Sequence, residues 1–405
     1  MGDGMGGGRN EVEGESLSLV PSHLPLDFVK MAFLGSTAAL GSLFNFSVLR
    51  HLLSDYKKQR HRNHSLSAAF TLLKMNLTVC NLAVLIFYNT THVAWLVTYR
   101  WTGGDVLCRL CHFGFMLAFQ AMSNVVACIA IDRLRNVLRL LAMQRGGNYT
   151  HSDSVLRSVL LTGAWVGAAV FSAPQLAVWG TEEVEPGWEQ CMTIWEMGRL
   201  GRIKELSSRG ASATEIEEAF SARSLSLSNL PLQSLSTSRS TAEVLYCLLH
   251  LICVFWLPLL LCLGCYGLLC GLLIPLSQQS FSTSAQSGTG RRMGGSESSL
   301  GAESLQLVPA RTDFIDSSKV SVAENPGSSH QLTSLPEDQL RSRLLRTASQ
   351  IILAYICTWG PYNLLSLVVV VEPDFSDLLA NNLDWLKSLI ILNALLNPLL
   401  YKSSK

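Results

Sequence analysis

Charged side chains are scarce in this chain of 405 residues. Aspartate, glutamate, lysine and arginine make up 15% of it, whereas soluble domains carry about 25%. The two signs nearly cancel, leaving a net charge of +1, so nothing suggests a nucleic-acid partner. The deficit of charge is concentrated in long apolar runs, and this pattern is typical of proteins that cross a lipid bilayer.

Chemical motifs are also missing. The sequence has no phosphate-binding loop, no metal-ligand cluster and no nucleophile with a partnered base, so we expect no enzymatic activity, no cofactor and no bound metal. The opening stretch MGDGMGGGRNEVEGES lacks an apolar core and a cleavage site, so we expect no signal peptide. Most of the 11 cysteines lie within apolar runs, where cysteine packs as a small hydrophobic side chain.

Seven apolar runs have the length of about 20 residues that a membrane-spanning helix needs. The helices are expected near residues 28–53, 67–92, 105–137, 156–179, 243–275, 341–371 and 378–402. Asp384 and Lys387 interrupt the last of these runs. The predicted fold is an all-α bundle of seven transmembrane helices, which occupies residues 28–402.

Basic residues predict how this bundle is oriented. Lysine and arginine cluster after the first and third runs, at Lys57, Lys58, Arg60, Arg62, Arg133, Arg135, Arg139 and Arg145. Short loops rich in these residues stay in the cytoplasm. An odd number of spans then leaves the N-terminal tail, 1–27, outside the cell and the very short C-terminal tail, 403–405, inside.

Two connections between the runs are long. Residues 181–242 form the predicted second extracellular loop, which carries six lysines or arginines. Loops of about 60 residues cross the membrane largely regardless of their charge, so the predicted orientation is unaffected. Residues 276–340 form the predicted third cytoplasmic loop, whose serine- and glycine-rich composition indicates disorder.

The third run has a distinctive residue at each end. No charge falls between Arg109 and Asp132, a stretch of 22 residues. Cys108 and Arg133 are 25 residues apart, which is about 37 Å of helix and so places one at each membrane face. Cys191 is the only other cysteine in a predicted extracellular loop. A disulfide between Cys191 and Cys108 would tie that loop to the helix; the alternative is two unrelated free cysteines.

Further motifs occur in register with these two ends. They are Asn45 in the first run, Asp132-Arg133-Leu134 ending the third, Trp165 in the fourth, Pro258 and Tyr266 in the fifth, Thr358-Trp359-Gly360-Pro361 in the sixth and Asn397-Pro398-Leu399-Leu400-Tyr401 in the seventh. In this order they resemble the motifs of a rhodopsin-like (class A) G-protein-coupled receptor, across all seven helices. The resemblance implies a multi-pass receptor of the plasma membrane that activates a heterotrimeric G-protein.

The resemblance also implies a role for each motif. Arg133 would pair with Asp132 at rest and would move toward Tyr266 and Tyr401 on activation. Pro361 would act as a hinge, because proline removes a backbone hydrogen bond from the helix. The expected activation switch comprises Trp359, Pro361, Asn397 and Pro398. The expected G-protein contacts comprise Leu141, Arg343 and Arg346.

Two positions depart from the family pattern. Asn81 stands where most members have a buried aspartate in the second helix, and the seventh helix has Asn397. No carboxylate is therefore available for the family's sodium site. Arg341 stands where many relatives have an acid that faces the arginine of the third helix. We expect the lock between those two helices to be missing and the basal activity to be raised.

Several segments resemble more narrowly the receptors for gonadotropin-releasing hormone and adipokinetic hormone, with the vasopressin and oxytocin receptors as close cousins. These segments are TYRWTGGDVLC (98–108), FSAPQLAVW (171–179), QCMT (190–193) and VEPDF (371–375). They imply a peptide hormone or neuropeptide as ligand, and Gq/11 as partner with calcium mobilisation. At positions where that group has polar or charged ligand contacts, this chain has His92, Phe115, Val369 and Ala380. A divergent receptor with another ligand, or with none, is therefore the alternative.

Candidate ligand contacts belong to the outer halves of four helices. They are His92, Trp95, Phe115, Gln120, Trp359, Tyr362, Asn363, Asp384 and Lys387. Lys387 either pairs with Asp384, three residues earlier, or contacts an acidic group or carbonyl of the ligand, because a membrane-embedded ammonium is costly alone. Four glutamates beside Cys191 belong either to a solvated loop or to a surface that steers a basic peptide. They are Glu182, Glu183, Glu185 and Glu189.

A small membrane transporter is the rival from another class of protein. It would predict inverted-repeat symmetry, broken helices and an ion site at the midplane of the bilayer. No such repeat is visible in the sequence, and Asn81 with Asn397 offers no buried acid to hold an ion. The receptor interpretation is therefore preferred.

Overall fold

The computed structural model describes residues 23–62, 65–144, 153–210, 240–272, 335–371 and 376–402. At the ends of these segments some side chains, among them those of 335–344 and 376–385, lie outside the described part of the chain. Residues 1–22 of the expected N-terminal tail, 276–334 of the expected third cytoplasmic loop and the tail 403–405 lie wholly outside it.

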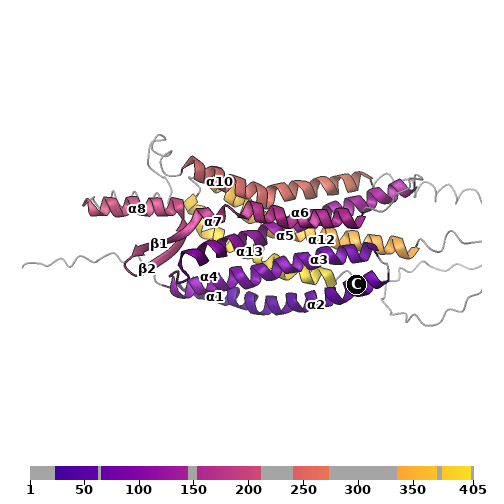
Figure 1. Cartoon of the computed structure of the whole chain (residues 1–405), viewed down its shortest axis with the longest axis horizontal. Helices are drawn as coiled ribbons and strands as arrows, with labels where there is room; N and C mark the ends of the chain where they lie inside the picture. The colour runs from indigo at the N-terminus through magenta and orange to yellow at the C-terminus, as the bar shows by residue number, and fades with distance from the viewer. Residues whose placement is uncertain are drawn as a thin grey trace, which may run out of the picture.

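Seven helical spans run along the long axis of the described molecule (Figure 1). The first span is α1 (Pro25–Ser36), η1 (Thr37–Gly41) and α2 (Ser42–His61); the second is α3 (Ser65–Ala83), η2 (Val84–Tyr88) and α4 (Asn89–Thr98); the third is α5 (Gly104–Gln144). The fourth span is α6 (Asp153–Ser172) and α7 (Gln175–Val178), and the fifth is α10 (Thr241–Leu251), η4 (Ile252–Trp256) and residues 257–272. The sixth span is α12 (Leu335–Val371) and the seventh is α13 (Ser376–Lys402).

Several spans are longer than the apolar runs that predicted them. α12 begins at Leu335, whereas the sequence predicted a disordered loop up to residue 340. Pro336 suits this position, because the fixed φ of proline is compatible with the first turn of a helix. α5 continues to Gln144, past its predicted end at residue 137. Hydropathy marks where a helix leaves the bilayer, and its hydrogen bonding can continue beyond that point.

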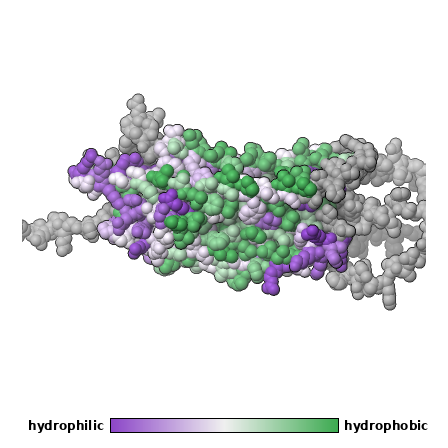
Figure 2. All heavy atoms as spheres, viewed as in Figure 1, coloured by the Kyte–Doolittle hydropathy of each residue, from purple (hydrophilic) through white to green (hydrophobic). Residues whose placement is uncertain are grey.

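On the face that Figure 2 shows, apolar residues form a belt over the middle of the bundle, while polar residues gather toward its two ends. Its exposed side chains include Leu43, Val166, Leu260, Leu353 and Leu364. Among the described residues, six helices are long and apolar enough to cross a membrane, and the seventh span contributes the shorter apolar stretch Leu386–Tyr401. A continuous apolar surface of this kind is the face that lipid tails would contact.

The third span, α5, is the central element of the bundle. It packs against α3, α6 and α12. Its buried side chains include Ala121, Met122, Val125, Val126 and Ile129. Polar bonds fix the fourth span beside it: Asn124 Nδ2 donates to the carbonyl of Ala164 at 2.9 Å. Trp165 Nε1 donates to Asn76 Oδ1 at 3.1 Å and so joins the fourth span to the second.

Three of the spans contain a π-helical turn, at η1, η2 and η4. Such a turn bulges the backbone and is frequent at functional sites. Gly41 closes η1, and a Cβ atom on Gly41 would lie 2.7 Å from Cδ2 of Leu395 in the seventh span. The first and seventh spans therefore approach each other more closely than any larger residue at position 41 would allow.

The connection from the fourth to the fifth span contains regular structure where the sequence suggested a loop. Strands β1 (Trp179–Glu185) and β2 (Trp188–Thr193) form an antiparallel hairpin in which Thr181 is opposite Cys191. Helix α8 (Ile194–Ser208) follows and projects beyond the end of the bundle (Figure 1). Thr193 and Glu196 form a capping box, in which each side chain accepts from the other's backbone N–H.

Candidate functional site

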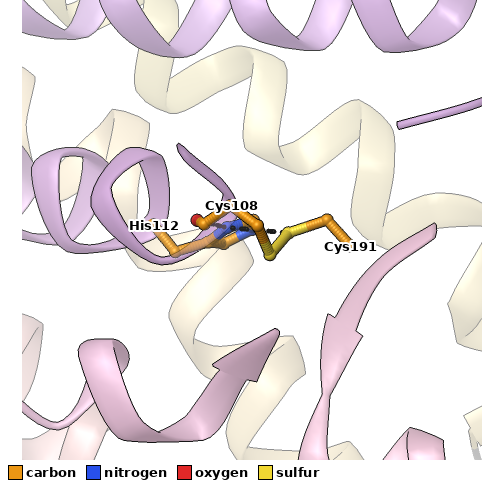
Figure 3. A group of neighbouring side chains, drawn as sticks. All are labelled: Cys108, His112 and Cys191. Carbon is orange, nitrogen blue, oxygen red and sulfur yellow. Dashed lines mark hydrogen bonds between the residues drawn. A yellow bond between two sulfur atoms is a disulfide. The ribbon is translucent and has the colours of Figure 1, made fainter. Parts of the chain in front are cut away.

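A disulfide anchors the hairpin to one end of the bundle. Cys108 in α5 is bonded to Cys191 in β2, with 5.7 Å between their Cα atoms (Figure 3), so the predicted disulfide is present. Asp105 reinforces the anchor, because its carboxylate accepts from the backbone N–H of Thr181 at 3.1 Å. The same carboxylate pairs with Arg109 at 2.7 Å. The first turns of the third span thus hold the hairpin through covalent and polar bonds.

His112 lies beside this disulfide (Figure 3). Its Nδ1 is 3.0 Å from the carbonyl oxygen of Cys108 and 3.5 Å from Sγ of Cys191. Its ring stacks on that of Trp179, with 3.5 Å between centroids. One histidine and two cysteines with ligand atoms within 4.8 Å of one another suggest a metal centre, but a disulfide lacks the thiolate charge that metal binding needs. We interpret the group as a structural element.

Tyr99 joins the first span, the second span and the hairpin. It ends α4 with a φ of 48°, a left-handed conformation that is uncommon in residues other than glycine. Its hydroxyl donates to Asp27 at 2.5 Å, and its carbonyl accepts from Trp188 Nε1 at 2.7 Å and from the amide of Gln190. Burial, followed by the bond to Asp27, raises the pKa of Tyr99 to about 12. The hydroxyl therefore remains a donor at physiological pH.

Two glutamates of the acidic cluster contact other parts of the connection between the fourth and fifth spans. Glu183 accepts from the backbone N–H of Gly187 at 2.6 Å and so shapes the turn between the strands. Glu182 lies 3.9 Å from Nζ of Lys204 in α8. These contacts support the solvated-loop interpretation, and the steering of a basic peptide stays a prediction.

The spans enclose a cavity of about 560 Å³ beside the hairpin, which is within the usual range for a ligand site. Half of its lining residues carry aromatic rings: Tyr88, His92, Trp95, Trp101, His112, Phe115, Phe119, Trp179, Tyr246, His250, Trp359 and Tyr362. Among the described lining residues, Lys387 is the one lysine or arginine, and there is no aspartate or glutamate. The cavity therefore suits an apolar or aromatic body that carries an acidic or carbonyl group.

Seven of the nine predicted ligand contacts line this cavity: His92, Trp95, Phe115, Trp359, Tyr362, Asn363 and Lys387. Gln120 is not among the lining residues. Its amide donates to the carbonyl of Cys253 at 2.8 Å and to Asn124 at 3.1 Å, so it holds the third span against the fifth. The side chain of Asp384 lies outside the described residues. Contact of any of these residues with a ligand stays a prediction.

Trp359 connects the cavity to the core of the bundle. It lines the cavity and is only 1% exposed. Phe119 packs edge-on against its ring, with 5.7 Å between centroids, and Tyr355 lies 5.2 Å away. The hydroxyl of Tyr355 donates to Ser123 in the third span at 3.1 Å. A ligand that displaces Trp359 would therefore press on Tyr355 and, through it, on the third span.

Proline interrupts the helical hydrogen bonding of the last two spans. Pro361 lies within α12 and Pro398 within α13, and each removes one backbone donor. Asn363 Nδ2 donates to the carbonyl of Trp359 at 2.9 Å, so a side chain supports the backbone on both sides of Pro361. The hinge role of Pro361 stays a prediction.

Asparagines occupy the polar core between the first, second and seventh spans. Asn81 Nδ2 donates to Asn45 Oδ1 at 3.3 Å, and Asn397 Nδ2 donates to Asn81 Oδ1 at 3.5 Å. Asn45 also donates to the carbonyl of Ala394 at 3.0 Å. All three asparagines are fully buried. Neutral amides that bond to one another give no negative charge to hold a sodium ion.

The opposite end of the third span carries an ion pair between Arg133 and Asp132. Asp132 also accepts from Asn136 at 3.1 Å and lies 3.6 Å from Nε of Arg157 in the fourth span. Arg133 is 2% exposed and Asp132 is 3% exposed. Asp132 therefore contacts one arginine of its own span and one of the fourth span, and its pairing with Arg133 is the arrangement that the resemblance implies for a resting receptor.

Tyr266 and Tyr401, the two tyrosines that Arg133 is predicted to approach on activation, do not bond to it in this structure. Within the described structure, the hydroxyls of Tyr266 and Tyr401 make no hydrogen bond to it. Leu141 is half-buried near the end of α5, and Arg346 is exposed near the start of α12. The side chain of Arg343 lies outside the described residues. Contact of these three residues with a G-protein stays a prediction.

Sequence reasoning missed several residues of the cavity. Tyr88 belongs to η2 and Val254 to η4, so two π turns contribute to the lining. His112 and Trp179 reach it from beside the disulfide, and Tyr246 from the start of the fifth span. Hydropathy carries no signal of a π turn. The aromatic spacing of Tyr88 to His92, one helical turn, was the available hint.

Comparison with known proteins identifies the family. The model of the 7 transmembrane receptor (rhodopsin family) matches residues 59–206 and 232–401. The chain is 27% identical to G-protein coupled receptor daf-38 of Caenorhabditis elegans, over 96% of this chain and 91% of that protein. It is 29% identical to the annetocin receptor of Eisenia fetida, over 43% of this chain and 36% of that receptor. It is 26% identical to the gonadotropin-releasing hormone receptor of Ovis aries, over 38% of this chain and 46% of that receptor.

The family match includes both ends of the third span, the cavity, and Asn81 and Asn397 of the asparagine core, whereas Asn45 precedes the first matched residue. Members of this family are receptors and not enzymes: they bind a ligand on the outer side and a G-protein on the inner side. The N-terminus is extracellular, the C-terminus is cytoplasmic, and the disulfide-linked hairpin lies on the outer face. The chain thus belongs to the rhodopsin family of seven-transmembrane receptors and is a multi-pass protein of the plasma membrane.

Proposed function

We propose that a peptide hormone or neuropeptide activates this receptor by binding in the cavity beside the β1–β2 hairpin. The observation that carries the proposal is the aromatic wall of that cavity, in a chain similar to receptors for annetocin and gonadotropin-releasing hormone. Tyrosine and tryptophan offer a large contact area at a small cost in conformational entropy. The cavity volume suits one end of a peptide, and the remainder would lie against the hairpin.

Lys387 gives the cavity its polarity. Its ammonium would bind an acidic group or a carbonyl of the ligand, since Lys387 is the one lysine or arginine among the described lining residues. The competing role, pairing with Asp384, uses the same charge for structure. Lys387→Met and Lys387→Arg separate the two roles. If Lys387→Met shifts the ligand dose–response to higher concentrations at normal surface expression, Lys387 contacts the ligand. If Lys387→Met loses surface expression, Lys387 pairs with Asp384. Lys387→Arg keeps the positive charge, so it should be less affected than Lys387→Met under either role.

The signal would leave the cavity through Trp359. Its displacement moves Tyr355 and the sixth span, which Pro361 weakens at this point. The outward movement of α12 opens a space at the cytoplasmic end for the C-terminal helix of Gα. We propose Gq/11 as the partner, by analogy with the hormone-receptor group, so that the cellular response is a rise in calcium.

A panel of amidated and free-acid peptides tests the ligand class. The receptor is expressed in cells, its surface level is confirmed by an extracellular tag, and calcium is recorded with and without a Gq/11 inhibitor. A response that the inhibitor removes supports both parts of the proposal. A response that persists, or that appears only in a cyclic-AMP assay, contradicts Gq/11 alone. A silent panel with confirmed surface expression contradicts the peptide ligand.

A small organic acid is the second candidate ligand. Phe115 and His92 line the cavity at positions where the hormone-receptor group has polar or charged contacts, and a cavity of about 560 Å³ can bury most of a small molecule. The same cells, challenged with apolar or aromatic carboxylic acids and with their methyl esters, distinguish this candidate. Activity of the acids, but not of the esters, in a receptor that ignores peptides would favour it.

A further inference from the structure

Arg133 has a second partner besides Asp132. Its guanidinium carbon lies 4.4 Å from the ring centroid of Phe70 in the second span. Phe70 is fully buried and Arg133 is almost so, which means that water does not screen the contact. The quadrupole of an aromatic ring attracts a cation placed over its face, and the attraction increases when both groups are desolvated.

Lys74 approaches the same ring. It lies one turn further along α3, and its Nζ is 4.9 Å from the ring centroid of Phe70 and 5.7 Å from that of Tyr401. Both faces of an aromatic ring are negative, so one ring can attract two cations. Cation–ring contacts therefore link Arg133 to Phe70, Phe70 to Lys74 and Lys74 to Tyr401, so the second span connects the third span to the seventh.

This series of contacts ends at Tyr401, a tyrosine that Arg133 would reach on activation. To approach Tyr401, the guanidinium must leave the ring of Phe70. It must also come closer to the ammonium of Lys74, which carries the same charge. Repulsion between like charges is stronger in a protein interior than in water. Both effects favour the resting position of Arg133.

We propose that Phe70 is a positioning residue for Arg133 in the resting receptor, and that Lys74, held between Phe70 and Tyr401, opposes the movement of Arg133 toward Tyr401. The restraint acts without any ligand. It partly compensates for the missing acid at Arg341, where the lock between the third and sixth helices is expected to be absent. The inference depends on the family's coupling to a G-protein and not on the identity of the ligand.

Ligand-free nucleotide exchange tests the proposal. Membranes that contain the full-length receptor are mixed with each class of Gα, and binding of a non-hydrolysable GTP analogue is measured per receptor. Phe70→Leu and Lys74→Met should raise this basal exchange on the order of 3- to 30-fold, the ratio that corresponds to one desolvated cation–ring contact. Phe70→Tyr keeps the ring and Lys74→Arg keeps the cation, so both should stay close to wild type.

Phe46→Leu is the matched control. Arg50 lies over the ring of Phe46 at 5.8 Å, but this pair is on the exposed side of the first span. Its loss should leave basal exchange unchanged. The proposal is overturned if Phe70→Leu has wild-type exchange at a normal surface level. It is also overturned if Phe70→Tyr raises exchange as much as Phe70→Leu, because the ring would then be irrelevant.

A second variant series covers the case in which Phe70→Leu does not reach the surface. Fluorinated phenylalanines at position 70 withdraw charge from the ring face with little change in volume. Exchange should rise stepwise with the number of fluorine atoms, and a flat series would overturn the proposal. The double variant Phe70→Leu/Lys74→Met should raise exchange by less than the product of the two single effects, because both act through Arg133; a fully multiplicative effect would count against the shared restraint.

Discussion

The imidazole of His112 lies flat on the indole of Trp179, with 3.5 Å between the ring centroids and 13° between the ring planes. One ring belongs to the third span and the other to the first residue of β1, so the stack joins the bundle to the hairpin beside the disulfide. Both rings also line the cavity. The outer wall of the cavity therefore depends on ring packing as well as on the covalent bond.

Removing this stack should loosen the hairpin while the disulfide remains. Trp179→Ala should lower the Tm of the detergent-solubilised receptor by about 1–2 °C, which corresponds to a loss of ~1 kcal/mol in a chain of this size. Trp179→Phe keeps a ring that can stack and should lose less. Thermal unfolding followed by intrinsic fluorescence measures both values. Equal losses in the two variants would show that stacking contributes nothing.

Two glycines of the first span form a matched pair for packing. At Gly41 an added Cβ would lie 2.7 Å from Leu395, whereas at Gly35 nothing lies within 4 Å. Gly41→Ala should therefore destabilise the receptor by about 1–3 kcal/mol, because the first and seventh spans must separate. Gly35→Ala should be neutral or stabilising by up to about 1 kcal/mol, since glycine is unfavourable within a helix. Unfolding midpoints of the two variants check the prediction, and the reverse order would contradict it.

The hydroxyl of Tyr99 should stabilise the outer end of the bundle up to high pH. Tyr99→Phe removes its bond to buried Asp27 and should cost about 1.5–3 kcal/mol. The pKa of Tyr99 rises from 10.0 to about 12 on folding. A raised pKa means that the fold favours the protonated form, so this contribution is complete below pH 10 and is lost as the pH rises toward 12. The gap in Tm between wild type and Tyr99→Phe should therefore be constant from neutral pH to pH 10 and narrow above it; a gap that changes near neutral pH would contradict the assignment.

Asn81→Asp should make the receptor sensitive to sodium. A carboxylate at this buried position loses the donor to Asn45 and introduces an uncompensated charge, at a cost on the order of 3 kcal/mol. Sodium should recover part of that loss, whereas the wild-type asparagine core should respond equally to sodium and choline chloride. Thermal unfolding in the two salts at equal ionic strength measures the difference. A sodium effect on the wild type itself would show that a cation binds without a carboxylate at position 81, and it would contradict the neutral-core interpretation.

The parts of the fold that could be predicted are those that lipid or covalent chemistry imposes. Apolar runs of bilayer length must become helices, because no other open structure satisfies its backbone in lipid. Cys108 and Cys191 could be paired because topology left no other extracellular cysteine, and Asp132 with Arg133 was identified by position at the end of the third run. These features depend on local sequence and on the order of the spans.

The parts that could not be predicted depend on side-chain geometry between spans. Gln120 was expected in the cavity because it is polar and lies in the outer half of a helix, yet the carbonyl of Cys253 and the amide of Asn124 bind it. His112 and Trp179 were not expected there, because only the fold of the hairpin brings them together. Phe70 reads as an ordinary apolar residue in the sequence, and its contact with Arg133 is visible only in three dimensions.

The π turns at η2 and η4 separate the inner and outer halves of the second and fifth spans. Each turn adds a residue to one helical turn, so the face that points inward shifts by one position between the two halves. A relative that lacks such a turn would present a different residue to its cavity even where the surrounding sequences align without a gap. Ligand preference in this receptor can therefore diverge by the gain or loss of a single residue within a span, while the cytoplasmic half keeps its G-protein contacts unchanged.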